Sequence, residues 1–383
     1  MTPSTWSPRL LAPGIAVQPL AVGCRGIGGP SVPGGSSTGC STSRDDAALE
    51  GLRTAVLLGA NLFDTADFFG FGHSERLLGR LVAEVGRTSV LLSSKAGRVR
   101  GTAPHPYAAP ALRHRLEQTL ENLDTEYVDL YSLHSLDFGN SDQYLDVAIE
   151  QLLAFRSVGC VRAIGMPGPP VERRRGGPHD AALRSGQAQF RKIFNLLRPD
   201  FVWSSGNPLL SPPHVAGEPL TEFAARHKVA LLLTEPLAQG LVTGKYTPQR
   251  PPRFTSGDQR CGSPLFGSAA LHIIDAELMP LRDRFGSRPE NLAHVALRFA
   301  LEQGDHTVVA AGFSTARQVA GNLAAGPALT AQELTCVAEA YRRMRQRLHE
   351  ELLSADRQQA RSAHAVQRHG VEDIPAVGSI GAT

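Results

Sequence analysis

Three side chains with acid–base chemistry stand at the ends of three successive apolar runs. Asp64 and His134 each directly follow a run, and Lys95 follows a third run after two serines. An ammonium group near an apolar interior must be paired or have its pKa depressed. Asp64 is the obvious partner for it. The three residues together predict an acid–base cluster in which Asp64 holds Lys95 charged and Lys95 tunes a neighbouring proton donor.

Each of these residues also has an ordinary structural interpretation. An aspartate at a strand end often caps a turn. Considered alone, Asp64 is therefore as readily explained by a turn as by a catalytic role. A single histidine such as His134 is more often a packing residue. Lys95 is the hardest of the three to dismiss, and it makes the cluster the better hypothesis.

The elements that must position the cluster alternate regularly along the chain. Seven apolar runs and an eighth in or just after Ile15–Val22 predict strands, at Ala60–Phe63, Val90–Leu92, Val128–Leu133, Val161–Ile164, Phe201–Trp203, Ala230–Leu233 and Thr307–Ala311. Helical patterns lie between them, at Asp45–Leu58, Ser74–Val85, Pro110–Leu123, Val147–Val158, Ala181–Leu197, Thr221–His227, Asn291–Glu302 and Ala316–Ala325. Repeated strand–helix units imply parallel strands. Eight units fit a (β/α)8 TIM barrel better than a doubly wound sheet with a second domain.

The long connections and the ends of the chain complete this organisation. We expect an N-terminal extension over 1–14, a single barrel domain over 15–345, and a C-terminal helix and loosely ordered tail over 346–383. Long βα loops are expected at Gly29–Ser43, Val171–Gly186 and Thr247–Ser268, which are rich in Gly, Ser, Pro or polar residues. Loops of such length are usually functional lids or disordered.

The composition argues against several classes of protein. The 383 residues carry a net charge of +3 without a long basic run, which disfavours a nucleic-acid partner. No apolar run is long enough to span a bilayer, and the N-terminus has no signal-peptide pattern. The five cysteines are scattered without CxxC pairs, so we expect free thiols, a cytoplasmic location and no metal site. Oligomeric state cannot be read from the sequence.

Several motifs, in order and spacing, resemble the aldo-keto reductases. They are the stretch Phe63–Glu75, then Lys95, Leu130–His134, Pro236–Lys245 and Gly312–Asn322. The resemblance covers about residues 15–345 and is nearest to the aldose and galactose dehydrogenase-like branch. It implies a (β/α)8 barrel that interconverts carbonyls and alcohols with NADP(H), acting on a small-molecule carbonyl or sugar-like substrate.

The resemblance also gives roles to single residues. It implies a catalytic tetrad of Asp, Tyr, Lys and His, in which Tyr donates the proton, and Asp64, Lys95 and His134 fall on three of these positions. The position of the Tyr is occupied by Phe69. A phenyl ring has no proton to give, so the usual general acid is absent. His73, His105 and Tyr107 lie in nearby loops and are candidates to replace it.

The cofactor positions implied by the resemblance are mixed. The nicotinamide carboxamide is usually held by Ser, Asn and Gln, but here Pro167, Gly168 and Trp203 stand at those positions, and Gly206 replaces the usual stacking ring. The phosphate-binding positions agree better, and they are Pro236, Leu237, Gln239, Gly240, Leu241, Lys245, Gly312, Ser314, Arg317, Gln318 and Asn322. Ser314 and Arg317 begin a predicted helix, where free amides and the dipole favour an anion. An arginine that chelates the 2′-phosphate would favour NADP over NAD, although Arg317 could also simply face solvent.

Three functions follow from these observations. The first is an NADP(H)-dependent oxidoreductase for an aldehyde, ketone or lactol, in which His134 or a water held by Lys95 replaces the Tyr donor. The second is a non-redox lyase, dehydratase or isomerase that uses Lys95 and His134 on a carbonyl substrate. The third is a catalytically inactive cofactor-binding homologue. We favour the first, because a lost general acid lowers a rate without abolishing it.

Overall fold

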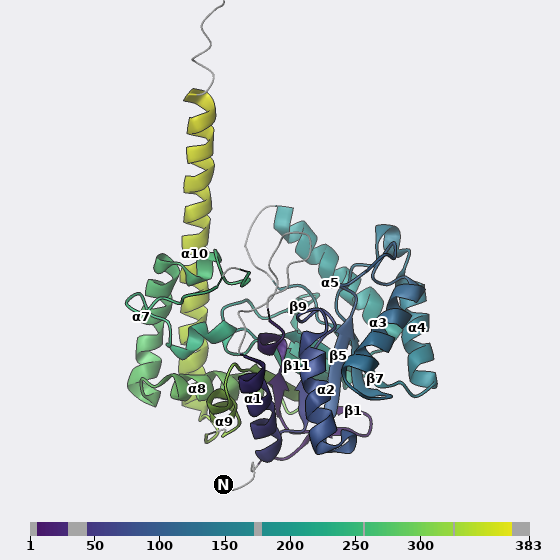
Figure 1. The fold of residues 1–383 in the computed structure, drawn as a ribbon. Helices are drawn as coiled ribbons and strands as arrows, with labels where there is room; N and C mark the ends of the chain where they lie inside the picture. The colour runs from purple at the N-terminus through teal and green to yellow at the C-terminus, as the bar shows by residue number, and fades with distance from the viewer. Residues whose placement is uncertain (1–5, 30–43, 172–177, 256, 325, 370–383) are drawn as a thin grey trace, which may run out of the picture.

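The computed structural model describes residues 6–29, 44–171, 178–255, 257–324 and 326–369. Within these ranges, only the backbone is described for 178–182 and 355–369. Eight parallel strands close into a barrel in the order β11-β12-β3-β4-β5-β6-β7-β8 (Figure 1). Their bounds are Leu20–Gly23 for β3, Leu62–Asp64 for β4, Leu91–Ala96 for β5, Val128–Leu133 for β6, Val161–Pro167 for β7, Phe201–Ser205 for β8, Ala230–Thr234 for β11 and Thr307–Gly312 for β12. The predicted (β/α)8 barrel is confirmed.

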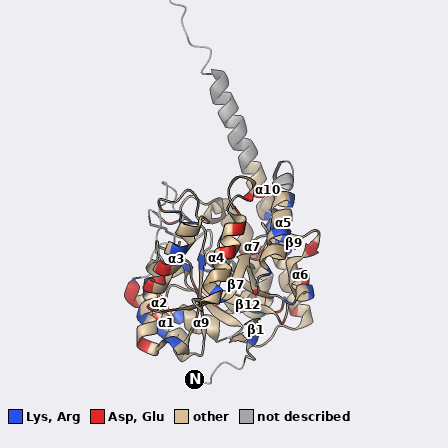
Figure 2. Ribbon diagram, turned by 90° about the vertical axis from the view of Figure 1, so that its right-hand side faces the viewer, with Lys and Arg blue, Asp and Glu red and all other residues tan. Residues whose placement is uncertain are grey.

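Helices surround the barrel and follow its strands in turn. They are α1 (Asp45–Leu57), α2 (His73–Val85), α3 (Ala109–Asn122), α4 (Leu145–Ser157), α5 (Pro178–Leu197), α6 (Leu220–His227), α7 (Ser268–Phe285), α8 (Pro289–Leu301), α9 (Ala316–Leu323) and α10 (Ala331–His369). Short β-bridges and 3-10 turns occupy the connections, among them β9 (His214–Val215), β10 (Glu218–Pro219), η1 (Arg25–Ile27), η3 (Arg87–Ser89), η4 (Asn140–Asp142), η5 (Ala238–Thr243) and η6 (Pro264–Phe266). Basic and acidic residues both occur along the helices in Figure 2.

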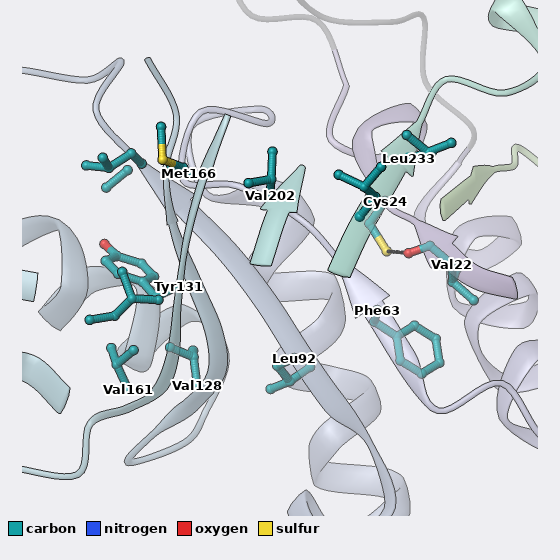
Figure 3. Close-up of a cluster of buried hydrophobic side chains, with 14 of the residues drawn as sticks. Val22, Cys24, Phe63, Leu92, Val128, Tyr131, Val161, Met166, Val202 and Leu233 are labelled. Atoms are coloured by element: carbon teal, nitrogen blue, oxygen red, sulfur yellow. Dashed lines mark hydrogen bonds between the residues drawn. The ribbon is translucent and has the colours of Figure 1, made fainter. Parts of the chain in front are cut away.

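The apolar residues form two layers, because a strand of a barrel sends alternate side chains inward and outward. The outward layer packs against the helices and includes Val22, Phe63, Leu92, Tyr131 and Val202 (Figure 3). The inward layer is a separate cluster that fills the barrel; its strand residues are Ala21, Leu62, Leu130, Ala163, Phe201, Ala230, Leu232, Val308 and Ala310. The barrel interior is therefore a packed core rather than a channel.

A β-hairpin closes the amino-terminal end of this interior. The strands β1 (Arg9–Ala12) and β2 (Ile15–Val17) pair antiparallel, and their apolar side chains join the inward cluster. The expected run Ile15–Val22 is thus divided between β2 of the hairpin and the barrel strand β3. The hairpin also straddles the expected boundary between residues 14 and 15, because its apolar face needs both strands to cover the core.

The C-terminal part of the chain departs from expectation in two ways. The sequence pattern did not predict α7, and α10 begins well before the expected boundary at 345/346. Val337, Tyr341, Met344 and Leu348 of α10 are buried in a cluster with residues of α7 and α8, so the helix starts as part of the body. Its later part projects past the other helices (Figure 1). α10 runs to His369, further than the expected start of the loose tail, and the last residues of that tail, 370–383, lie outside the described residues.

The three long loops expected from the sequence agree with the structure to different degrees. Residues 30–43 of the first loop and 172–177 of the second lie outside the described residues. In the second loop, α5 already begins at Pro178, so the later part of the expected loop is helical. The third loop has little regular structure until η6 and α7, as the sequence predicts.

Candidate active site

The carboxyl ends of three neighbouring strands bring the predicted cluster together. Asp64 is the last residue of β4, Lys95 lies near the end of β5, and His134 directly follows β6. The parallel register pairs Asp64 with Ser93 and Lys95 with Ser132, so the strand ends are level. This end of a (β/α)8 barrel is where such enzymes carry their chemistry.

Lys95 and Asp64 form a buried ion pair. The Lys95 Nζ lies 2.6 Å from Asp64 Oδ1 and also donates to the carbonyl oxygen of Thr65 at 2.9 Å. The same Asp64 oxygen accepts a hydrogen bond of 2.7 Å from Ser93 Oγ. The exposed fractions are only 2% for Lys95 and 4% for Asp64. Because a buried ammonium needs a compensating charge, Asp64 keeps Lys95 available as a cation at the floor of the site.

His134 completes the cluster as a neutral imidazole. Burial, followed by the positive charges of Lys95, Arg98 and Arg25, holds the pKa of His134 well below its ordinary value. The ring meets Phe69 and Trp203 edge-on, at centroid distances of 6.0 and 5.6 Å. Its Nδ1 is buried and has no hydrogen-bond partner among the described residues. Buried polar atoms are normally bonded, so this orphan atom marks a place where a ligand or water completes the site.

Phe69 stands where the missing hydroxyl would be needed. Its half-buried ring lies 5.9 Å from Lys95 Nζ and 6.0 Å from the imidazole of His134. The structure thus places this phenyl group beside two of the three remaining members of the cluster, Lys95 and His134. It offers neither a hydrogen-bond donor nor a titratable proton.

The three residues expected as replacements for the Tyr have other contacts, and His73 begins α2 rather than lying in a loop. His73 Nε2 lies 2.9 Å from Asp45 Oδ1, and His105 stacks on Tyr144 at 4.6 Å. The Tyr107 hydroxyl donates to the carbonyl oxygen of Ser135 and accepts from its backbone N–H. No hydrogen bond from any of the three to Asp64, Lys95 or the His134 side chain is found among the described residues.

The expected carboxamide positions carry no polar side chain that faces the cluster. Pro167 ends β7, and the Gly168 N–H donates to the carbonyl oxygen of Trp203 at 2.7 Å. The indole Nε1 of Trp203 donates to the carbonyl oxygen of Leu133 at 3.0 Å, and Lys95 Nζ lies 5.5 Å from the indole ring. A Cβ on Gly206 would approach the Leu233 Cβ to 3.0 Å. Backbone groups and an indole thus occupy the positions of the side chains that usually bind the nicotinamide carboxamide.

The loop after β11 has the features of a ligand cradle. Gln239 and Gly240 within η5 have positive φ angles of 58° and 93°. Strained backbone of this kind concentrates at functional sites. The buried Gln239 Oε1 has no hydrogen-bond partner among the described residues. A Cβ on Gly240 would meet Lys245 Cε at 2.3 Å, so only glycine allows this lysine to lie across the loop.

The remaining phosphate-binding candidates gather where β12 leads into α9. Asn322 Nδ2 donates to the carbonyl oxygen of Gly312, and Gln318 Oε1 accepts from the Ser314 N–H. Arg317 has an exposed side chain whose Nη2 lies 2.8 Å from Glu290 Oε1. The predicted helix start is confirmed. Arg317 stands in solvent beside a carboxylate.

These observations test the fit of a dinucleotide cofactor. The glycine cradle under Lys245 and the exposed arginine on α9 supply positive charge that fits its phosphate half, whereas the orphan Gln239 oxygen needs a hydrogen-bond donor such as a hydroxyl or amino group. The nicotinamide half would meet Trp203, Pro167 and Gly168. These residues suit contact with the nicotinamide ring better than hydrogen bonding to its carboxamide. The described residues contain no group of three or more His, Cys, Asp and Glu side chains that could hold a metal ion.

Two residues at the site escaped the analysis of the sequence. Arg25 follows the end of β3 and Arg98 follows the end of β5, and both act on His134. Their position just after barrel strands was the available signal. An arginine in such a position moves no proton and acts on the site through its charge alone.

Three comparisons with known proteins bear on these observations. The model of the Aldo/keto reductase family matches residues 26–342. L-galactose dehydrogenase of Arabidopsis thaliana is 26% identical over 288 residues, which are 73% of this chain and 78% of that protein. An uncharacterized oxidoreductase of Mycobacterium tuberculosis is 30% identical over 300 residues, which are 78% of this chain and 83% of that protein. The solved glycerol dehydrogenase of Gluconobacter oxydans shares the fold, with a TM-score of 0.65 and 24% identity over 88% of this chain and 95% of that one.

Proposed function

The chain belongs to the aldo/keto reductase family and is an enzyme of the oxidoreductase type, and from this premise we propose that it interconverts a carbonyl compound and an alcohol with NADP(H). The observation that carries the proposal is the buried Lys95–Asp64 pair beside His134 at the carboxyl ends of the barrel strands. Bound NADP(H) would supply or accept the hydride.

The residues of the cluster divide the remaining work. Lys95 offers a fixed positive charge to the carbonyl oxygen, where negative charge develops during reduction. His134, being neutral, has one ring N–H that can hydrogen-bond that oxygen, and a water held by Lys95 would supply the proton that completes the alcohol. Asp64 holds the lysine in place, and Phe69 and Trp203 exclude water from the reacting atoms. General acid catalysis contributes about 10²–10⁴-fold, so without the Tyr we expect a slower rather than an inactive enzyme.

The proposed substrate is an aldehyde, ketone or lactol of sugar-like kind. The name of the Arabidopsis relative, L-galactose dehydrogenase, supports this choice and the corresponding branch of the family. A location in the cytoplasm stays a prediction. In the part of the chain that the structure describes, no helix has the length and apolar character needed to cross a membrane.

Cofactor binding is the first test. The purified chain is titrated with NADPH and with NADH, and cofactor fluorescence and thermal shift are followed. We expect NADPH to bind more tightly, and Arg317→Gln to reduce this preference about tenfold, since an arginine–phosphate contact is a strong charge-assisted interaction.

Arg226→Gln is the matched control for this test. Arg226 is also an exposed arginine paired with a glutamate, but it lies on α6. The preference for NADPH should survive this substitution. Equal affinity for both cofactors would contradict the NADP(H) assignment. Binding of neither would favour the non-redox alternative on the same fold.

A further inference from the structure

A cavity of about 70 Å³ lies between the barrel wall and the helices that cover β11. Its apolar wall is formed by Leu220 of α6, Leu231 and Leu233 of β11, and Phe299 of α8. Leu231 and Leu233 belong to the outward layer of the barrel, whereas Leu232 between them belongs to the inward cluster. The cavity therefore lies on the outer side of the barrel wall.

The cavity is separate from the candidate active site. It is bordered by Ser205 at the end of β8, but Trp203 of the same strand packs against the inward cluster and lies over Lys95. Of the described residues that line the cavity, none belongs to the cluster of Asp64, Lys95 and His134. A molecule in this cavity would thus touch the far side of the strand that carries Trp203.

Arg345 of α10 is the charged side chain among the described residues that line the cavity. Its half-buried guanidinium donates from Nη1 to the carbonyl oxygen of Pro208 at 2.9 Å. In the part of the chain that the structure describes, this guanidinium has no acidic partner and no second hydrogen bond. Arg87 and Arg282, by comparison, each pair with an aspartate at 2.7 Å.

The surroundings of Arg345 leave its charge uncompensated. Burial, followed by the positive charge of Arg342, lowers the pKa of Arg345. A cation that is partly withdrawn from water is stabilised when a carboxylate or another anion pairs with it. The geometry therefore favours an anion from outside the chain at this wall of the cavity.

We propose that the cavity binds a short aliphatic carboxylate, whose oxygens pair with Arg345 and whose hydrocarbon part lies against Leu231, Leu233 and Phe299. The inference goes beyond the proposed function and does not depend on it. A planar guanidinium matches the two oxygens of a carboxylate, and apolar side chains favour burial of the hydrocarbon. Inorganic phosphate would match the charge but would gain nothing from the apolar wall.

The size of the cavity limits the length of the ligand. An apolar cavity of about 150 Å³ accommodates benzene, so a cavity of half that volume suits roughly four to six non-hydrogen atoms. Butyrate is of this size and carries both the carboxylate and the apolar chain.

A calorimetric titration of the full chain without cofactor tests the proposal. The probes are butyrate, its neutral amide butyramide, acetate and inorganic phosphate. We expect butyrate to bind with a Kd of about 1 mM, which is ordinary for so small a ligand. Butyramide should bind about tenfold more weakly because it has no charge, and acetate and phosphate should bind more weakly because they lack the apolar chain.

Substitution of the arginine locates the site. Arg345→Gln should weaken butyrate binding about tenfold, and Arg345→Lys should weaken it less because the charge is kept. Arg342→Gln is the matched control, since Arg342 is an exposed arginine on the same helix whose guanidinium is held by Glu339. It should change the affinity less than about twofold, because a neighbouring exposed charge is largely screened.

A variant of the catalytic cluster separates this cavity from the active site. Lys95→Met combined with Asp64→Asn should bind butyrate as tightly as the unsubstituted chain. Loss of binding in this double variant, with binding kept in Arg345→Gln, would overturn the inference by placing the carboxylate in the active site. Equal affinity for butyrate and butyramide, or no binding of millimolar butyrate, would also overturn it. These two comparisons use the unsubstituted chain, so they decide the matter even where a variant does not fold.

Discussion

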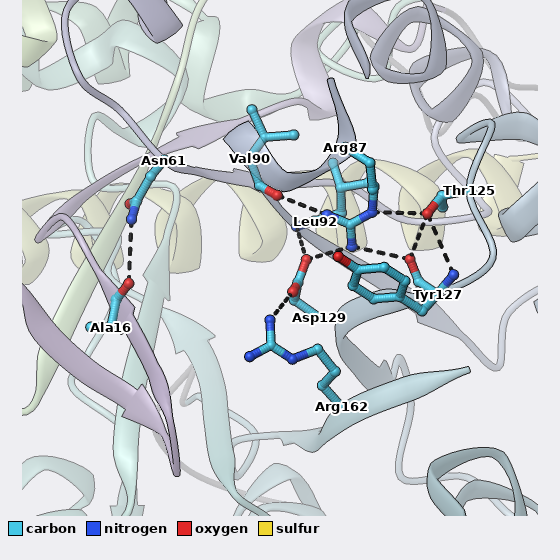
Figure 4. Close-up of polar contacts among 9 residues, drawn as sticks. All are labelled: Ala16, Asn61, Arg87, Val90, Leu92, Thr125, Tyr127, Asp129 and Arg162. Atoms are coloured by element: carbon cyan, nitrogen blue, oxygen red, sulfur yellow. Dashed lines mark hydrogen bonds and ion pairs between the residues drawn. The ribbon is translucent and has the colours of Figure 1, made fainter. Parts of the chain in front are cut away.

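The two ends of β6 carry buried titratable side chains that differ in how well the chain satisfies them. Asp129 lies near its start, and His134 directly follows its end, about 16 Å away at the usual rise per residue. Asp129 is fully buried; its Oδ2 accepts from Arg87 at 2.7 Å and from the Leu92 N–H at 2.9 Å, and its Oδ1 accepts from Arg162 at 2.5 Å (Figure 4). Both carboxylate oxygens are therefore satisfied by the chain itself.

The other end leaves polar atoms without partners. His134 Nδ1 and Ser132 Oγ are buried and have no hydrogen bond among the described residues. A buried charge network whose hydrogen bonds are all made within the chain stabilises the fold. Buried polar atoms that have no partner in the chain indicate a position for a ligand or water. The comparison teaches that substitutions at Asp129 should change stability, and substitutions at the cluster should change activity.

The largest expected effect is loss of activity in Lys95→Met. Removing the ammonium takes away the positive charge at the carbonyl oxygen, and we expect kcat/KM to fall about 10³-fold. Steady-state reduction of an aldehyde measures it. The double variant Lys95→Met with Asp64→Asn should recover stability without recovering activity, because it no longer leaves a buried carboxylate unpaired. Full activity in either variant would remove the cluster from the chemistry.

Asp129→Asn should give the opposite result. The substitution leaves Arg87 and Arg162 without their carboxylate, and we expect the free energy of unfolding to fall by about 3 kcal/mol. Urea denaturation measures this loss. Meanwhile kcat/KM per folded molecule should stay within about twofold of the unsubstituted chain. A large loss of kcat/KM in the folded variant would break the contrast between the two ends.

Phe69→Tyr sharpens the comparison by adding the missing donor. The ring lies close to Lys95 and His134, so a hydroxyl on it would face the cluster. We expect kcat for carbonyl reduction to rise about 10–100-fold, within the usual range for general acid catalysis. Phe71→Tyr, on an exposed ring nearby, is the control and should give no gain. No gain in Phe69→Tyr would mean that another donor already serves the reaction.

The smallest expected effect concerns pH. Because the pKa of His134 is held below its ordinary 6.5, the unfolded chain binds a proton there that the folded chain does not. The free energy of unfolding should therefore fall as pH decreases below about 6.5, by at most about 1.4 kcal/mol per pH unit from this group. His134→Gln should flatten the dependence, whereas His272→Gln on α7 should not. An unchanged slope in His134→Gln would show that the imidazole titrates normally.

Much of the architecture could be predicted from local patterns. Apolar runs that alternate with amphipathic stretches indicated parallel strands and their helices, and the boundaries agree closely with β6 and α1. The pattern missed α7, since its apolar positions are less regular and Pro280 interrupts it. It also merged β2 with β3, because a hairpin strand and a barrel strand have the same apolar appearance.

The sequence by itself determined the barrel and the meeting of Asp64, Lys95 and His134, because parallel strands deliver their last residues to one rim. Only the tertiary structure decided what surrounds that cluster. Arg25 meets Glu235 across 210 positions of sequence, and Trp203 places its indole over Lys95. Periodicity tells which face a side chain takes, but it carries no information on neighbours that distant strands bring together. The charge of the site depends on those neighbours.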